Sequence, residues 1–229
     1  MYKRQGKGYC AVKNTRKLII FDLDGTLLDT SDGILHCYHK TASMLNLRKN
    51  SVENDSIVIG GPLSDGFRTL YDIPDEETLA KAIDTYRNLY ANEGIAKFSV
   101  YNGIDTALSK LKSDGYKLGV ATLKLEEYAK SMLKNAGLAK YFDIIHGWNG
   151  TEKCTKAYTV TKVLFEQKCL AKNAVLVGDS VYDKNGAEIA GVDFLGVTYG
   201  FGIKKGDKTN SRFDTVDSPV ELTEYFKIN

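Results

Sequence analysis

The sequence predicts an α/β protein: a Rossmann-like parallel sheet core with helices on both faces, plus a small all-helical cap domain inserted after the first strand. Two observations carry this prediction. From Tyr101 onward, short apolar runs alternate with helical patterns, which is typical of parallel strands joined by right-handed crossovers. Before that point, residues 31–98 show helical patterns alone. We therefore expect a core of residues 16–30 and 99–229 and a cap of residues 31–98.

Length and composition limit the protein classes. The 229 residues suffice for one core domain with a modest insertion, and 43% hydrophobic residues is ordinary for a globular chain. A net charge of +2 gives no reason to expect a nucleic-acid partner, and no apolar stretch reaches the length of a membrane helix. The cysteines are scattered without a CxxC pair, so neither a zinc site nor a redox pair is indicated, and reduced thiols in a cytoplasmic protein are expected.

Residues 1–15 are basic and contain no acidic side chain. The apolar core of a secretory signal does not follow them, because only the short first strand is apolar there. We expect a poorly ordered lead-in. A basic arm that contacts an anion is the less favoured alternative.

The first strand is predicted at Leu18–Phe21, an apolar run that fits a buried strand of a parallel sheet. Asp22 and Asp24 follow directly, and Gly25 allows a sharp turn out of the strand. Carboxylates at this strand end would face the crevice in which open α/β folds keep their ligands. Because two close carboxylates repel each other, a divalent cation would relieve the strain. The alternative is a turn followed by a helix cap.

Helical periodicity fills the segment up to residue 98. Apolar residues from Ile34 to Leu45 recur at the spacing of one helix face. A glycine–proline turn at residues 60–62 interrupts the pattern, a short helix follows from Leu63, and a longer one begins near Asp75. No strand is expected in this segment, and the connections at its two ends would act as hinges.

The C-terminal part alternates strands and helices. The predicted strands are 116–122, 141–146, 174–178, 194–198 and 213–216. The predicted helices follow residue 103, run through 129–136, begin at 156, run through 186–190 and begin at 219. The carboxyl ends of such strands lie side by side, so polar residues at those ends are candidates for one site.

The stretch Phe21–Asp29, FDLDGTLLD, resembles the first motif of the haloacid dehalogenase-like hydrolases, and more narrowly the branch that contains phosphoglycolate phosphatases. The resemblance extends over residues 17–229, since this branch carries a helical cap at the same place. It implies that Asp22 is the nucleophile and that Asp24 is the general acid and base. Because relatives with dehalogenase activity lack the second aspartate, Asp24 favours phosphoryl transfer.

Thr122 stands at the end of a predicted core strand. Its hydroxyl could donate to a phosphate oxygen, joined by N–H groups at the start of the following helix, or it could simply cap that helix. The family has a threonine or serine here that binds the phosphoryl group, which implies this role for Thr122 with Leu123 beside it. Many relatives continue with Ser-Lys-Pro, whereas this chain continues with Leu123-Lys124-Leu125, so Lys124 is given no role.

A lysine is expected to balance the negative charge of a phosphate and several carboxylates. Lys153 and Lys156 both follow the third strand of the core. Lys156 opens an amphipathic helix, and its distance from Asp179 resembles the family's third motif. We therefore prefer Lys156 to Lys153.

The stretch Val177–Asp183, VGDSVYD, ends an apolar run in Gly-Asp and places a second aspartate one helical turn later. In the family, the first aspartate of GDxxxD binds Mg²⁺ together with the nucleophile and a backbone carbonyl of the acid/base residue. The resemblance implies Asp179, Asp22 and the carbonyl of Asp24 as Mg²⁺ ligands, with Asp183 acting from behind them or through water. The alternative is a helix cap with a surface acid.

The cap is expected to select the substrate. Gly61 lies in a glycine–proline turn that resembles the one such caps place near the active site. Arg68 could pair with a substrate anion, because a guanidinium fits a carboxylate or phosphate. His36 and His39 could do likewise. The more common alternative for each of these side chains is a solvated helix face.

These residues together predict a Mg²⁺-dependent phosphatase that hydrolyses a small phosphomonoester through an aspartyl-phosphate. Phosphoglycolate, a nucleoside monophosphate or a sugar phosphate would each be a possible substrate. A phosphomutase would use the same intermediate, and a non-catalytic binding protein on this scaffold is the other alternative. The expected partner is a small phosphorylated metabolite, with no nucleic acid and no membrane, and the chain would act as a monomer or homodimer in the cytoplasm.

Overall fold

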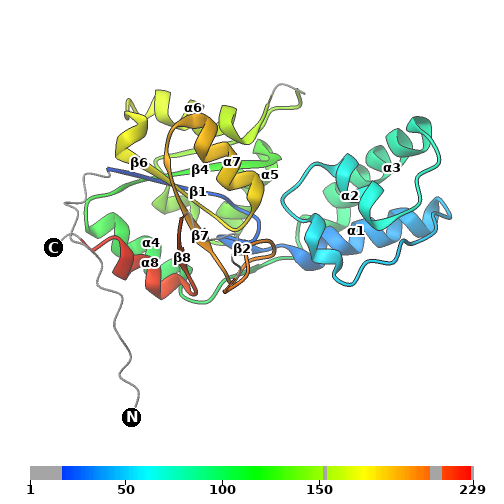
Figure 1. Ribbon diagram of the computed structural model, residues 1–229, viewed down its shortest axis with the longest axis horizontal. Helices are drawn as coiled ribbons and strands as arrows, with labels where there is room; N and C mark the ends of the chain where they lie inside the picture. Colours follow the sequence, from blue (N-terminus) through cyan, green and yellow to red (C-terminus); the bar gives the residue numbers. More distant parts are fainter. Residues whose placement is uncertain (1–16, 152–153, 207–212, 228–229) are drawn as a thin grey trace, which may run out of the picture.

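A computed structural model describes residues 17–151, 154–206 and 213–227. Its centre is a sheet with strands β1 (Leu18–Phe21), β4 (Lys117–Leu125), β5 (Ile144–Trp148), β6 (Ala174–Gly178), β7 (Asp193–Val197) and β8 (Asp214–Val216). The strand order is β5-β4-β1-β6-β7-β8, and each neighbouring pair is parallel (Figure 1). The first strand therefore lies inside the sheet, with Phe21 opposite Val120 on β4 and Val177 on β6.

Helices cover both faces of the sheet. One face carries α4 (Ile104–Ser113), α5 (Glu126–Asn135) and α8 (Pro219–Tyr225), and the other carries α6 (Lys156–Glu166) and α7 (Val181–Ala190). Successive side chains of a strand point to opposite faces. Accordingly, Ile19 and Phe21 pack in the cluster of α4, α5 and α8, whereas Leu18 and Ile20 pack in the cluster of α6 and α7. All four side chains are fully buried.

A helical segment lies beside the core, at the right of Figure 1. It consists of α1 (Ser31–Met44), the 3-10 turn η1 (Asp55–Val58), α2 (Leu63–Leu70), α3 (Glu76–Leu89) and the π-helical turn η2 (Tyr90–Gly94). These elements have an apolar cluster of their own. At its centre, the Tyr38 ring lies 4.7 Å from the Phe67 ring and 4.8 Å from the Tyr86 ring, centroid to centroid.

Two short strands connect the helical segment to the core. They are β2 (Leu28–Asp29), which leads into the segment, and β3 (Ser99–Val100), which leads out of it. The two pair antiparallel, with Leu28 opposite Val100 and Asp29 opposite Ser99. The entry and exit of the helical segment are therefore held side by side.

The predicted fold class is confirmed. The largest differences from the predicted strand boundaries, three residues each, are at the end of β4 and the start of β5. The strand β4 continues to Leu125 instead of ending at Thr122, because Leu125 pairs with Trp148 after a shift in register. The strand β5 begins at Ile144, because Ala139–Tyr141 form a 3-10 turn (η3) before it. A third 3-10 turn, Ala171–Asn173 (η4), precedes β6. The basic lead-in and Lys153 lie outside the described residues.

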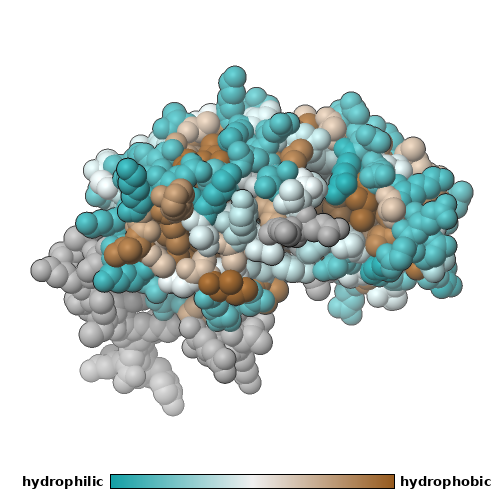
Figure 2. Space-filling view, turned by 90° about the horizontal axis from the view of Figure 1, so that it is seen from above, coloured by the Kyte–Doolittle hydropathy of each residue, from teal (hydrophilic) through white to brown (hydrophobic). Residues whose placement is uncertain are grey.

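The surface of the described part of the chain is mixed. Figure 2 shows hydrophilic residues over most of one face, with hydrophobic residues gathered in a few places, one of them beside the helical segment. None of the helices in the described ranges combines the length and the apolar character that crossing a membrane requires.

Candidate active site

Two buried aspartates follow β1 directly. Asp22 is 4% exposed and Asp24 is 6% exposed. The N–H of Asp22 donates to the Val177 carbonyl at 2.9 Å, so the sheet pairing continues into the site. The chain then turns at Gly25, whose φ of +84° suits glycine. A Cβ at this position would collide with the carboxylate of Asp179, so glycine also lets the loops after β1 and β6 approach each other.

Lys156, the first residue of α6, reaches the same point. Its Nζ contacts Oδ1 of Asp22, lies 2.7 Å from Oδ1 of Asp183 and donates to the Ala121 carbonyl at 2.9 Å. The side chain is buried. Although burial disfavours its charged form, the carboxylates of Asp183 and Asp22 raise the pKa of Lys156. A permanently charged ammonium group therefore stands beside Asp22.

Three carboxylates meet at the ends of β1 and β6. Asp22, Asp179 and Asp183 each offer one oxygen within 4.8 Å of the others, and all three are buried. Burial raises the pKa of Asp22 to about 7, helped by the charges of Asp183 and Asp24 and opposed by Lys156. Burial also raises the pKa of Asp179, and the charges of Asp183 and Asp22 raise it further. Burial is thus the main cause of both pKa shifts, and the neighbouring carboxylates add to it.

Hydrogen bonds fix two of these carboxylates. Asp179 Oδ2 accepts from the N–H of Phe201 at 2.7 Å and from that of Gly202 at 3.3 Å. Asp183 forms a capping box with Ser180 at the start of α7, with Ser180 Oγ donating to Asp183 Oδ2 at 2.5 Å. Asp183 thus combines a helix cap with an ion pair to Lys156.

The acidic cluster fits a magnesium ion. Its donors are all carboxylate oxygens, the ligand type that Mg²⁺ prefers. Within the described residues, Lys156 pairs with two of the three carboxylates, so an excess of negative charge is left in a buried place. A divalent cation would balance this excess.

Thr122 lies at the predicted position, and its side chain is 1% exposed. Its Oγ1 accepts from the N–H of Lys124 at 3.1 Å. The helix expected directly after Thr122 begins only at Glu126, because β4 extends to Leu125. N–H groups near Thr122 therefore belong to an extended chain, and the expected helix terminus is not there.

The sequence prediction missed two parts of the site. Lys124 Nζ lies 3.0 Å from Asp24 Oδ1, its side chain is 7% exposed, and it stands 4.8 Å from the centroid of the Tyr90 ring. The loop around Gly202 supplies the N–H groups that hold Asp179. The Gly-Phe-Gly stretch after β7 was a signal for this loop, since glycines let backbone approach closely.

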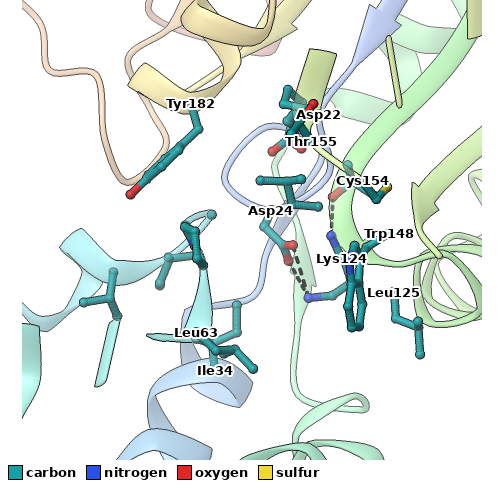
Figure 3. A pocket seen from close by; sticks show the side chains of 18 of the residues that line it. Asp22, Asp24, Ile34, Leu63, Lys124, Leu125, Trp148, Cys154, Thr155 and Tyr182 are labelled. Carbon is teal, nitrogen blue, oxygen red and sulfur yellow. Dashed lines mark hydrogen bonds and ion pairs between the residues drawn. The ribbon is translucent and has the colours of Figure 1, made fainter. Parts of the chain in front are cut away.

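A cavity of about 960 Å³ extends from this site to the helical segment. Asp22, Asp24, Thr122, Leu123 and Lys156 line it from the core, and Gly61 lines it from the helical segment. In Figure 3, Lys124 and Asp24 point toward each other, while Ile34 and Leu63 come from the helical segment.

Three predicted cap residues lie outside the lining of this cavity. Arg68 pairs with Glu76 at 2.5 Å. His36 contacts Glu93 at 3.0 Å, and His39 contacts Asp55 at 3.2 Å. The structure therefore does not bring Arg68 together with the other predicted site residues.

A family model and several known proteins are similar to this chain. The sequence model described as haloacid dehalogenase-like hydrolase matches residues 19–197. Tyrosine-protein kinase PtkA of Mycobacterium tuberculosis is 30% identical over 187 residues, which cover 81% of this chain and 63% of the kinase. The chain thus spans less than two thirds of that relative. Phosphoglycolate phosphatase of Aquifex aeolicus is 31% identical, with 91% of this chain and 95% of the enzyme covered.

The solved structures give the same picture. A haloacid dehalogenase-like family hydrolase of Streptococcus pneumoniae superimposes with a TM-score of 0.83 at 30% sequence identity. The match covers 93% of this chain and 99% of that chain. The similarity therefore includes the helical segment as well as the sheet.

Proposed function

Since the chain belongs to the haloacid dehalogenase-like hydrolases, we propose that it is a Mg²⁺-dependent phosphatase that hydrolyses a small phosphomonoester through an aspartyl-phosphate. The observation that carries the proposal is the meeting of two carboxylates, a threonine and a buried lysine at one end of a cavity (Asp22, Asp24, Thr122 and Lys156). Phosphatases among the relatives support the same reaction class.

In the first half-reaction, a carboxylate oxygen of Asp22 attacks phosphorus as the bond from phosphorus to the ester oxygen breaks. Asp24 acts as the general acid that delivers a proton to the departing oxygen, so that an alcohol leaves. In the second half-reaction, Asp24 takes a proton from water, and the water oxygen attacks the phosphorus of the aspartyl-phosphate. Inorganic phosphate leaves, and the carboxylate of Asp22 is restored.

The surrounding residues bind and orient the phosphoryl group. The Lys156 ammonium balances the negative charge that gathers on the phosphoryl oxygens and keeps Asp22 in place. The hydroxyl of Thr122, a residue of the cavity lining, donates to a phosphoryl oxygen together with the N–H of Leu123. Lys124 holds the carboxylate of Asp24 in position.

Asp22, Asp179 and the backbone carbonyl of Asp24 would hold the magnesium ion, with Asp183 behind them. When bound, Mg²⁺ neutralises charge on the phosphate and on the nucleophile. Asp183 already pairs with Lys156 and caps α7, so its role is to hold Lys156 and the start of α7 in position.

The helical segment, residues 31–98, acts in this proposal as a cap domain on a core of residues 16–30 and 99–229. Its own apolar cluster and the paired strands β2 and β3 support this division. The cap closes one side of the cavity through residues such as Gly61 and Leu63. Exclusion of water by such a cap would favour attack by Asp22 over side reactions.

The test is phosphate release from a panel of phosphomonoesters in the presence of Mg²⁺. We expect wild type to turn over and Asp22→Asn to lose at least about a thousandfold in kcat, because the nucleophile is gone. The exposed Asp32→Asn on α1 is the matched control and should keep wild-type rates. A chelator should stop the reaction, and added Mg²⁺ should restore it.

The alternatives give different results. A phosphomutase would return the phosphoryl group to another hydroxyl of the substrate without free phosphate. A binding protein would bind phosphate analogues with Mg²⁺ and never turn over. Full activity of Asp22→Asn would refute the proposed nucleophile.

A further inference from the structure

The cavity is much larger than the reaction requires. Sites for drug-sized ligands range from roughly 300 to 1,000 Å³, and this cavity, at about 960 Å³, is at the upper end. The phosphoryl group needs only the end near Asp22 and Thr122. A leaving group as small as a two-carbon acid would leave most of the remaining volume unfilled.

The remaining walls are apolar and rich in flat side chains. Tyr90 and Tyr128 line the cavity with their ring centroids 5.9 Å apart. Trp148 lines it from the end of β5, and its indole N–H already donates to the Thr151 carbonyl at 2.8 Å. What Trp148 offers a ligand is therefore its aromatic face. In Figure 3, Trp148 and Leu125 lie on the core side of the cavity, across from Leu63.

The cations of the cavity are mostly occupied. Within the described lining, Lys156 contacts Asp22, and Lys124 pairs with Asp24. The third lining cation, Arg87 on α3, has its Nη1 3.8 Å from Asp84 Oδ1, and its Cζ lies over the Trp148 ring, 5.2 Å from the centroid. This contact joins the helical segment to the core and adds another planar group to the wall. An anionic leaving group would thus find few unpaired partners, whereas a neutral ring would find several π faces.

We propose that the substrate is a phosphomonoester whose leaving group carries a flat ring system, and that Trp148 and Arg87 determine this preference. The proposal rests on the proposed phosphatase function and specifies its substrate class. The phosphoryl end binds at Asp22, and the ring packs against the wall that contains Trp148 and Tyr128. Two sources share this chemistry: arylalkyl phosphates and nucleoside 5′-monophosphates.

Matched substrate pairs test the proposal, because both members of a pair have the same kind of leaving oxygen. One pair is ethyl phosphate and 2-(1-naphthyl)ethyl phosphate, and the other is ribose 5-phosphate and adenosine 5′-monophosphate. We expect the ring-bearing member to have a kcat/KM at least about tenfold higher in one pair or both, as burial of a ring-sized apolar group allows. The pair with the larger ratio identifies the source. Decyl phosphate measures the effect of apolar burial without a ring.

The variants test the assigned residues. Trp148→Ala and Arg87→Gln should each lower the ratio within the favoured pair toward one, whereas Trp148→Phe should keep most of it. The matched control for Arg87→Gln is Arg48→Gln, an exposed arginine that pairs with Asp72 outside the cavity, and it should leave the ratio unchanged. If Trp148→Ala fails to fold, the kcat/KM ratios of wild type and of Arg87→Gln still test whether the ring is recognised.

Three results would overturn the inference. Ratios near one in both pairs would show that the ring is not recognised, although phosphate release from every substrate would leave the phosphatase function intact. A higher kcat/KM for decyl phosphate than for the naphthyl ester would show that the wall selects apolar length and not planarity. No phosphate release from any substrate would overturn the proposed function itself, and the substrate class with it.

Discussion

Lys124 and Asp24 form a buried ion pair that no sequence motif predicted. Their side chains are 7% and 8% exposed, and Nζ lies 3.0 Å from Asp24 Oδ1. Although burial disfavours the charged amine, Asp24 and the neighbouring Tyr90 raise the pKa of Lys124. Removal of one partner of such a pair leaves an uncompensated charge in a poorly hydrated place.

We expect Lys124→Met to lower the free energy of unfolding by about 3 kcal/mol, because the carboxylate of Asp24 loses its counter-ion. The double variant Lys124→Met with Asp24→Asn should recover most of this loss, since neither charge remains. Urea unfolding of the two single variants and the double variant measures the coupling. Simple additivity of the two single effects would show that the pair is not coupled.

At this scale, part of the site could be predicted from the sequence. Asp22 and Asp179 follow strand ends that a parallel sheet brings together, Asp183 comes one helical turn after Asp179, and the structure places all three within one cluster. Lys124 could not be found in this way. Its contact with Asp24 depends on the path of the chain after Thr122, which extends to Leu125 through pairing with Trp148. That pairing is a tertiary effect with no local signal.

The contact between α1 and η2 shows how closely two elements of the helical segment pack. A Cβ at Gly33 would meet the carbonyl oxygen of Gly94, which is a backbone atom and cannot rotate away. We expect Gly33→Ala to destabilise the protein by about 2 kcal/mol through overpacking, despite the better helix propensity of alanine. The control is Ser43→Ala on the exposed face of the same helix, which should be nearly neutral. Thermal unfolding of both variants and of wild type measures the difference in stability.

Glu93 of η2 makes the contact between η2 and α1 depend on pH. Hydrogen bonds from His36 and then Lys40, both on α1, lower the pKa of Glu93 from 4.5 to about 2. Because the folded value is the lower one, the stabilisation is complete above pH 4.5 and is lost as the pH falls toward 2. Glu93→Gln should therefore be less stable than wild type at pH 7. Its urea midpoint should also fall less than that of wild type as the pH is lowered from 4.5 toward 2. Parallel curves for both proteins would contradict this assignment.

Most elements of the sheet could be predicted because their apolar runs are short and bounded. The run Ala174–Gly178 is fully buried and ends in a glycine, and the predicted strand has the observed bounds. The start of β5 could not be predicted, because Tyr141 and Phe142 have strand-like side chains but lie at a 3-10 turn. Asp143 fixes this turn through Lys112 at 2.9 Å and the Leu118 N–H at 2.8 Å, contacts between segments far apart in sequence.

For the whole molecule, the proposed division into core and cap predicts that the core folds alone. In the test, a two-residue Asn-Gly turn replaces residues 30–98 and joins β2 to β3, whose antiparallel register suits a tight hairpin. We expect cooperative urea unfolding of this shortened chain, because the two core clusters keep all of their buried residues and lose only the partly buried Ile95 and Phe98. Its kcat/KM should fall at least about tenfold, because one wall of the cavity is gone. A non-cooperative transition would contradict the division.

The position of β1 in the middle of the sheet also affects the order of events on the ribosome. The chain makes Leu18–Phe21 first, yet the neighbours of this strand are residues 117–125 and 174–178. The apolar cluster of the helical segment draws its buried residues from Ile34 to Tyr90, so it can assemble while β1 still has no partner. A nascent chain therefore carries an apolar strand without any partner until Leu125 leaves the exit tunnel, and with one open edge until Gly178 follows, so this interval is when exposed apolar backbone favours aggregation.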